Sequence, residues 1–223
     1  LKGIPSLAEK IIVERDLSIL EEYNCKYHIS QISSAKTVDV IKRAKKEGKK
    51  FTVGVSINNL CLNEKNIGDF KTFLKLSPPL RTESDRLALI KGIDEGIIDV
   101  IVSDHKPEDE ESKRLTFAQA TTGATGVETL LPLSLELYHN KLINLKRLIS
   151  ALTCNPAKIL GLDKGSLKKG SDADLCILDI NKSWTVSKKK LKSKSKNTPI
   201  EDRKLRGQVI KTFVKGELSY DHS

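Results

Sequence analysis

The sequence predicts an α/β fold built on a parallel sheet, with a smaller β-rich unit at the carboxyl end. Three observations support this fold class. Apolar runs typical of strands alternate with helical patterns up to about residue 160, one of these runs is almost continuously apolar, and after residue 161 short strands follow one another with only turns between them. Alternating strands and helices are typical of a parallel sheet with crossover helices, in either an α/β barrel or a doubly wound sheet.

The elements of the first part follow from hydrophobic periodicity and from glycines at helix ends. We expect, in order, a helix over 6–20, a strand at about 26–32, a helix over 37–48, a strand at about 51–56, a helix over 85–96, a strand at about 98–103, and helices over 126–140 and 145–160. The third strand lies in the run IIDVIVS, which is typical of a strand buried on both faces. We therefore expect the three strands to be parallel.

The pattern changes after Gly161. Short strands are expected over 174–178, 184–186, 208–214 and 217–220, separated by Gly, Lys and Asn turns. We therefore place a domain boundary here, with residues 1–160 forming the part built on the parallel sheet and residues 161–223 forming a small β-rich domain.

A lysine-rich segment, residues 187–196 (SKKKLKSKSK), lies between two of the expected C-terminal strands. Such a run is compatible with a nucleic-acid patch or a localisation signal. A solvated loop has the same composition and requires no function, and it is the interpretation we favour.

Length and composition exclude several classes of protein. The chain has 223 residues, of which 38% are hydrophobic and 30% charged, and no apolar run approaches the ~20 residues that a membrane span needs. A net charge of +10 would suit nucleic acid, but the lysines are spread along the chain and aromatic residues make up only 4%, with no stacking motif. The four cysteines lie far apart without zinc-ligand spacing, so we expect reduced thiols in a cytoplasmic protein.

The beginning of the sequence is also informative. It has no basic segment leading into an apolar stretch, so no secretory signal is expected. The chain contains no methionine, even at its first position. We therefore expect a C-terminal piece of a longer protein.

Polar residues follow each of the three expected parallel strands. Asp104 and His105 follow the third strand, Gln31 and Ser33 the first, and the pair Asn58-Asn59 the second. In barrels and open parallel sheets, chemistry is usually placed at the carboxyl ends of the strands. A capping Asp and a surface His would look the same, so these residues alone leave function open.

The motifs around these residues resemble the C-terminal half of class I dihydroorotases, amidohydrolase-superfamily enzymes that interconvert carbamoyl aspartate and dihydroorotate in pyrimidine synthesis. The resembling stretches are residues 3–9 (GIPSLAE), 77–81 (SPPLR), 102–105 (VSDH), 126–133 (GVETLLPL), 155–157 (NPA), 165–175 (GSLKKGSDADL) and 195–199 (SKNTP). The resemblance covers essentially the whole chain, in order. It implies the C-terminal portion of a (β/α)₈ barrel that holds zinc at the carboxyl ends of its strands, with a small β domain. The family's N-terminal half, with its HxH metal pair, has no counterpart in these residues.

The chain departs from the family at positions that carry chemistry. The resemblance implies metal histidines where this chain has Gln31 and Asn58, and substrate-binding residues where it has Ser77 and Glu108. The aspartate that binds metal and shuttles the proton is kept as Asp104. An amide is a poor replacement for imidazole at zinc, because a neutral carbonyl oxygen is a weaker and harder donor. Zinc binding is therefore expected to be weak or absent.

Three hypotheses follow from the resemblance and its departures. The first is a catalytically impaired dihydroorotase-family protein, similar to the inactive paralogues that assemble with aspartate carbamoyltransferase as its structural partner. The second is an active zinc-dependent dihydroorotase with altered metal ligation, and the third is a basic binding module. A homo-oligomer is compatible with the first two, whereas neither nucleic acid nor membrane is expected as a partner.

Overall fold

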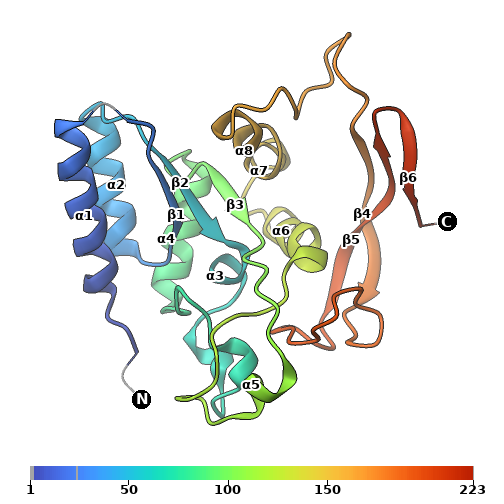
Figure 1. Ribbon diagram of the computed structural model, residues 1–223, viewed down its shortest axis with the longest axis horizontal. Helices are drawn as coiled ribbons and strands as arrows, with labels where there is room; N and C mark the ends of the chain where they lie inside the picture. Colours follow the sequence, from blue (N-terminus) through green and yellow to red (C-terminus); the bar gives the residue numbers. More distant parts are fainter. Residues whose placement is uncertain (1–2, 24, 223) are drawn as a thin grey trace.

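The computed structural model describes residues 3–23 and 25–222 (Figure 1). Its helices and strands are α1 (Ser6–Glu22), β1 (His28–Ile32), α2 (Ala35–Lys46), β2 (Thr52–Ser56), α3 (Ile57–Cys61), α4 (Glu83–Asp94), β3 (Val100–Val102), α5 (Glu110–Arg114), α6 (Leu130–His139), α7 (Leu145–Leu152), α8 (Cys154–Ile159), β4 (Leu175–Thr185), β5 (Lys204–Val214) and β6 (Glu217–Asp221). Short 3₁₀ helices cover Glu64–Ile67, Thr72–Leu74 and Val127–Thr129. Among these described residues no helix is both long and apolar enough to cross a membrane.

The first sheet confirms the predicted parallel strands. Its order is β1-β2-β3, and both neighbouring pairs are parallel. The register places Val53 opposite Ile29 and Val55 opposite Ile101, so the carboxyl ends of all three strands lie at the same edge. Beyond β3, an isolated parallel bridge between His105 and Ala124 continues the pairing in the same direction. Within the described residues the sheet stays open, as expected for part of a barrel.

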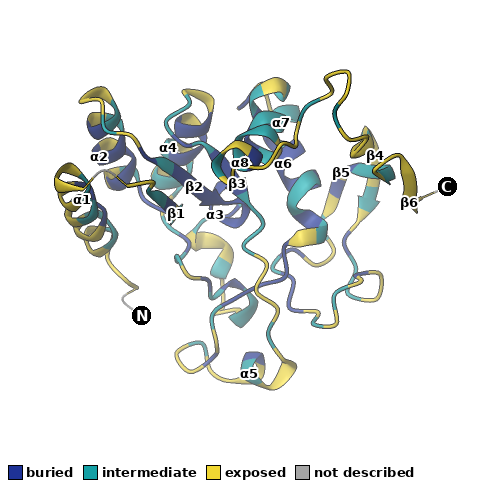
Figure 2. Ribbon diagram, turned by 45° about the horizontal axis from the view of Figure 1, so that its top comes forward, coloured by how far each residue is buried: buried dark blue, intermediate teal, exposed yellow. Residues whose placement is uncertain are grey.

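The core forms where helices cover this sheet. Helix α2 contacts both α1 and α4, whereas α7 contacts β3 and α6. Figure 2 shows the buried residues concentrated on β2, β3, α3 and the helix faces turned toward them. Close packing leaves no room at Gly54 of β2, because a Cβ there would lie 2.3 Å from the Ser30 carbonyl oxygen of β1. A strand glycine at a close backbone approach is the expected solution.

The C-terminal strands form a second, antiparallel sheet of order β4-β5-β6, and β5 packs against α6. The prediction of two separate strands over 174–178 and 184–186 is wrong, because β4 runs unbroken from Leu175 to Thr185. The polar stretch that looks like a turn is an irregularity inside the paired strand. There, Asp179 Oδ1 accepts hydrogen bonds from the backbone N–H groups of Asn181 and Lys182.

The expected single helix over 145–160 is also wrong. It is divided into α7 and α8 at Thr153, whose φ of −130° and ψ of −82° are not helical. Pro156, in the first turn of α8, has no backbone N–H to continue the hydrogen-bond ladder of α7. The Asn155 side chain next to it donates instead to the Asp99 carbonyl oxygen, at 2.8 Å, which ties α8 to the start of β3.

Candidate functional site

Two of the predicted site residues meet at the carboxyl edge of the parallel sheet. Gln31 is the penultimate residue of β1, and Asp104 lies two residues after β3. Gln31 Nε2 donates a hydrogen bond to Asp104 Oδ1 at 3.0 Å. Asp104 has a φ of +48°, a left-handed conformation that aspartate tolerates better than most residues and that turns the chain away from β3. The expected proximity of Gln31 and Asp104 is confirmed.

Asn58 lies at the same edge but in a different setting from the one expected. It belongs to the first turn of α3, which begins directly after β2 and is capped by Ser56 Oγ accepting from the Asn58 backbone N–H. Its side chain is 1% exposed, and among the described residues its Nδ2 has no hydrogen-bond partner and makes no bond to Gln31 or Asp104. A buried amide group without a partner costs about 1–3 kcal/mol. This amide is therefore held at the edge of the sheet at a cost to stability.

Neither nearby histidine is available as a replacement ligand. His28 begins β1, at the opposite end of the strand from Gln31, and its Nδ1 lies 2.7 Å from Thr52 Oγ1. Burial lowers the pKa of His28, and the charge of Asp99 opposes this shift. His105 follows Asp104, but its Nδ1 accepts a hydrogen bond from the Gly126 backbone N–H at 3.1 Å. The His105 ring thus supports the turn after β3 rather than the edge of the sheet.

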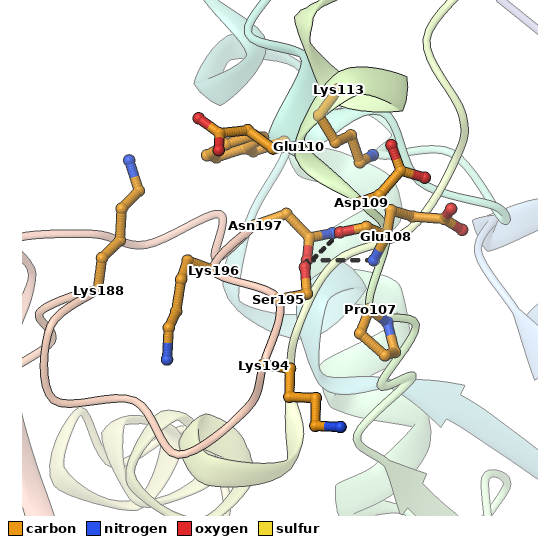
Figure 3. A pocket seen from close by; sticks show the side chains of 11 residues that line it. Pro107, Glu108, Asp109, Glu110, Lys113, Lys188, Lys194, Ser195, Lys196 and Asn197 are labelled. Carbon is orange, nitrogen blue, oxygen red and sulfur yellow. Dashed lines mark hydrogen bonds between the residues drawn. The ribbon is translucent and has the colours of Figure 1, made fainter.

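Ser77 and Glu108, the two substituted substrate positions, lie outside this contact. Ser77 is exposed and precedes a cis peptide bond to Pro78. Glu108 is half-buried, its backbone N–H donates to Asn197 Oδ1 at 3.4 Å, and it lines a cavity of about 610 Å³ (Figure 3). No described hydrogen bond connects either residue to Gln31 or Asp104.

Ser33, a third candidate after β1, has a structural role. It is fully buried, and its backbone N–H and that of Ser34 donate to the Glu9 carboxylate of α1 at 3.0–3.1 Å. Arg81 Nε donates to Ser33 Oγ at 3.0 Å. Periodicity alone gives no sign of this cluster, but Glu9 and Arg81 both lie within motifs shared with the family, GIPSLAE and SPPLR. The cluster fixes the chain immediately after Gln31.

The donor set that the described residues offer at the edge of the sheet does not by itself make up a zinc site. Structural and catalytic zinc sites take three or four protein ligands from thiolate, imidazole and carboxylate. The edge offers one carboxylate, Asp104, and one of its oxygens already accepts from the Gln31 amide. Within residues 3–23 and 25–222 there is no group of three or more His, Cys, Asp or Glu side chains that could hold a metal.

Comparison with known proteins shows the family to which this chain belongs. The model of the amidohydrolase family matches residues 2–219, so the chain belongs to the amidohydrolase family. The L-hydantoinase (dihydropyrimidinase) of Arthrobacter aurescens superimposes with a TM-score of 0.92 at 29% identity, over 97% of this chain and 49% of that one. The shared fold is thus that of one part of a larger amidohydrolase.

Among curated proteins, the chain is similar to dihydroorotases. The dihydroorotase of Ehrlichia canis (strain Jake) is 45% identical over 221 residues, which is 99% of this chain and 49% of that protein. The dihydroorotase of Geobacter sp. (strain M21) is 40% identical over 220 residues, 99% of this chain and 52% of that protein. The chain spans about half the length of the curated relatives it matches.

Proposed function

We propose that the chain is part of a dihydroorotase-family protein of pyrimidine biosynthesis in which this half of the metal centre has lost its function. The observation that carries the proposal is the 3.0 Å hydrogen bond from Gln31 Nε2 to Asp104 Oδ1. One oxygen of the Asp104 carboxylate, at the carboxyl edge of the sheet, therefore accepts a hydrogen bond from an amide. We infer a protein that is catalytically impaired and acts as a structural subunit.

The remaining chemistry of Asp104 is too weak for amide hydrolysis. A positioned carboxylate acting as a general base contributes typically ~10²–10⁴-fold. Enzymes of this kind accelerate reactions by ~10⁶-fold or more, so a general base alone leaves most of the barrier in place. The Gln31 amide also holds one of the two carboxylate oxygens, which reduces its availability as a base.

The substituted substrate positions point the same way. Dihydroorotate is an anion, and Glu108 places a carboxylate at a position that the resemblance assigns to substrate binding. Two like charges about 4 Å apart repel by about 1 kcal/mol in water and about 4 kcal/mol in a partly buried site. Ser77 has only a short hydroxyl side chain where the family has an asparagine. Restoring metal ligands alone is therefore insufficient for substrate binding.

Aspartate carbamoyltransferase is the partner we propose for this subunit. The support is the resemblance to inactive dihydroorotase paralogues; apolar side chains are also exposed on two faces of this part of the protein. The exposed apolar residues on α1 and next to it are Ile4, Leu7, Ile11, Ile12, Ile19 and Tyr23, and those on the C-terminal sheet are Leu175, Ile177, Val214, Leu218 and Tyr220. A stable complex needs an interface of at least ~1,000 Å². Co-elution of the full-length protein with aspartate carbamoyltransferase from the same source tests the partnership, and failure at micromolar concentrations contradicts it.

An active zinc-dependent dihydroorotase is the second candidate. It is favoured by the names of the relatives at 40–45% identity. In that case ligands from outside the matched half would complete a metal site around Asp104. Turnover of dihydroorotate by the full-length protein separates the two candidates.

The decisive experiment restores the lost ligands in the full-length protein. Gln31→His with Asn58→His should raise zinc affinity at least about tenfold, because imidazole replaces amide at two positions. Asn140→His, at the exposed end of α6, is the matched control and should leave zinc affinity unchanged. Glu108→His should be needed in addition before dihydroorotate binds. An unmodified protein that already hydrolyses dihydroorotate well above a blank contradicts the proposal.

A further inference from the structure

Residues 187–196, the lysine strap, form a surface loop whose backbone is held in place by other parts of the chain. Leu191 in its middle is 6% exposed. The backbone N–H groups of Lys192 and Ser193 donate to the Glu128 carboxylate at 2.9–3.0 Å. The segment is a loop with exposed lysines, as expected, but an acidic side chain and a buried leucine hold its backbone in place.

The end of the strap is fixed as well. Ser195 Oγ donates to the Glu108 carbonyl oxygen. The buried Asn197, just beyond the strap, donates from Nδ2 to the Gly123 carbonyl oxygen at 3.2 Å and accepts from the Thr125 backbone N–H at 3.2 Å. Much of the conformational entropy of this segment is thus already lost when the protein folds. A partner that binds the strap pays correspondingly less for immobilising it.

Most lysines of the strap have no side-chain partner among the described residues. Lys188 forms an ion pair with Glu201 and lies over the Phe73 ring, and Lys196 donates to backbone carbonyl oxygens within the strap. The remaining four are exposed and make no side-chain hydrogen bond or ion pair within the described part of the chain: Lys189, Lys190, Lys192 and Lys194. Four unpaired like charges on a fixed backbone repel one another. This repulsion raises the free energy of the unbound protein, and an acidic partner would relieve it.

An acidic wall faces the strap. The cavity of about 610 Å³ lies between strap residues that include Lys188, Lys194 and Lys196 and the segment 107–110, which contributes Glu108, Asp109 and Glu110 (Figure 3). Glu111 extends the acidic run into α5. The surface is thus basic on the strap side of the cavity and mainly acidic on the other, where Lys113 also lines the cavity and Glu110 pairs with Arg114.

We propose that the lysine strap is a docking surface for an acidic segment of a partner protein, one that places basic side chains against residues 108–111. The inference rests on the proposed role as an assembly subunit and names the surface through which assembly occurs. A protein partner can alternate the sign of its charges to match the strap and the acidic wall, which would favour specific pairing over general attraction.

Nucleic acid fits this surface less well. Duplex DNA carries one negative charge per ~1.7 Å of its axis, so phosphates would lie against the acidic wall as well as the strap. Single strands bind through aromatic stacking, and the aromatic ring lining the cavity, Phe73, is half-buried beneath Lys188.

The test uses the full-length protein and a fluorescein-labelled peptide of about twelve residues, a glutamate block followed by a lysine block, and measures its anisotropy at roughly 50 to 200 mM salt. The strap variant carries Lys189→Gln, Lys190→Gln, Lys192→Gln and Lys194→Gln. The control variant changes four exposed lysines elsewhere and has the same net charge: Lys26→Gln, Lys36→Gln, Lys46→Gln and Lys146→Gln. The strap variant should lose at least about tenfold in affinity, about 1.4 kcal/mol, and the control less than about twofold.

Equal losses in the two variants would mean that only net charge matters, and would overturn the proposal. So would a DNA duplex of about twelve base pairs that binds the unmodified protein more tightly than the glutamate–lysine peptide at roughly 150 mM salt. With Glu108→Gln and Glu110→Gln, DNA binding should strengthen several-fold, because the acidic wall is what disfavours it. The zinc content and dihydroorotate turnover of the strap variant should match the unmodified protein, so failure of the docking surface and failure of the proposed function give different results.

Discussion

Lys113 is the titratable group whose burial has the clearest measurable consequence. It lies on α5 beneath the acidic wall, is 3% exposed, and has no carboxylate within ion-pair distance among the described residues. Its Nζ donates to the backbone oxygens of Thr121 at 2.6 Å and Thr72 at 3.3 Å. Burial lowers the pKa of Lys113 from 10.5 to about 8, and nearby Glu108 opposes this change only in part.

This lowered pKa makes the free energy of unfolding depend on pH. Below pH 8 the ammonium of Lys113 is protonated in both states, and the folded state bears the full desolvation cost. Between about pH 8 and 10.5 the unfolded state binds more protons, so stability should rise with pH. A pKa difference of about two and a half, at ~1.4 kcal/mol for each unit, corresponds to a rise of about 3 kcal/mol.

Lys113→Met tests this reasoning, because it keeps an apolar stem and removes the charge. Urea unfolding of both proteins from about pH 7 to pH 10.5 should show the unmodified protein gaining about 2–3 kcal/mol relative to the variant. Groups with raised pKa values, such as Tyr27 and Cys61, are present in both proteins and cancel in the difference. Lys190→Met, at an exposed position, should show no such change. Parallel stability curves for Lys113→Met and the unmodified protein would refute the account of Lys113.

Three further predictions concern the sheet and its carboxyl edge. Gly54→Ala should destabilise the protein by about 3 kcal/mol or more in urea unfolding, because the new Cβ meets the Ser30 carbonyl oxygen. A change below about 1 kcal/mol would show that β1 and β2 lie further apart than in this structure. In a variant with Cys25→Ser, Cys154→Ser and Cys176→Ser, the thiol of Cys61, whose burial raises its pKa to about 12, should not react with Ellman's reagent until the protein unfolds, and rapid reaction of the native variant would contradict that burial. Gln31→Leu should cost about 1.5–3 kcal/mol through loss of the bond to Asp104, and unchanged stability would mean that this bond contributes nothing.

The fold of the first part was largely predictable because its strands are marked by local patterns. The strand expected at about 98–103 appears as Val100–Val102, and the helix expected over 85–96 appears as Glu83–Asp94. The capping box of Thr82 and Asp85 sets the start of that helix, which hydrophobic periodicity does not indicate. The bulge within β4 could not be predicted, because a polar stretch in a paired strand has the same composition as a turn.

The candidate site was predictable only where backbone topology decides it. Carboxyl ends of parallel strands share an edge, which is why Gln31 and Asp104 were expected together and are found together. The unpartnered amide of Asn58 depends on α3 beginning directly after β2, and the Ser56 cap that marks this start does not show how the Asn58 side chain is buried. The attachment of the lysine strap to Glu128 joins residues far apart in the chain, so composition could indicate only a loop.

The zinc content of the full-length protein tests the central claim most directly. Purified without chelators, dialysed against metal-free buffer and measured by inductively coupled plasma mass spectrometry, it should hold fewer than roughly one zinc per two chains, because the carboxyl edge offers one carboxylate where zinc needs three or four ligands. One or more zinc ions per chain, retained through dialysis and accompanied by dihydroorotate turnover, would contradict the account and identify an active hydrolase.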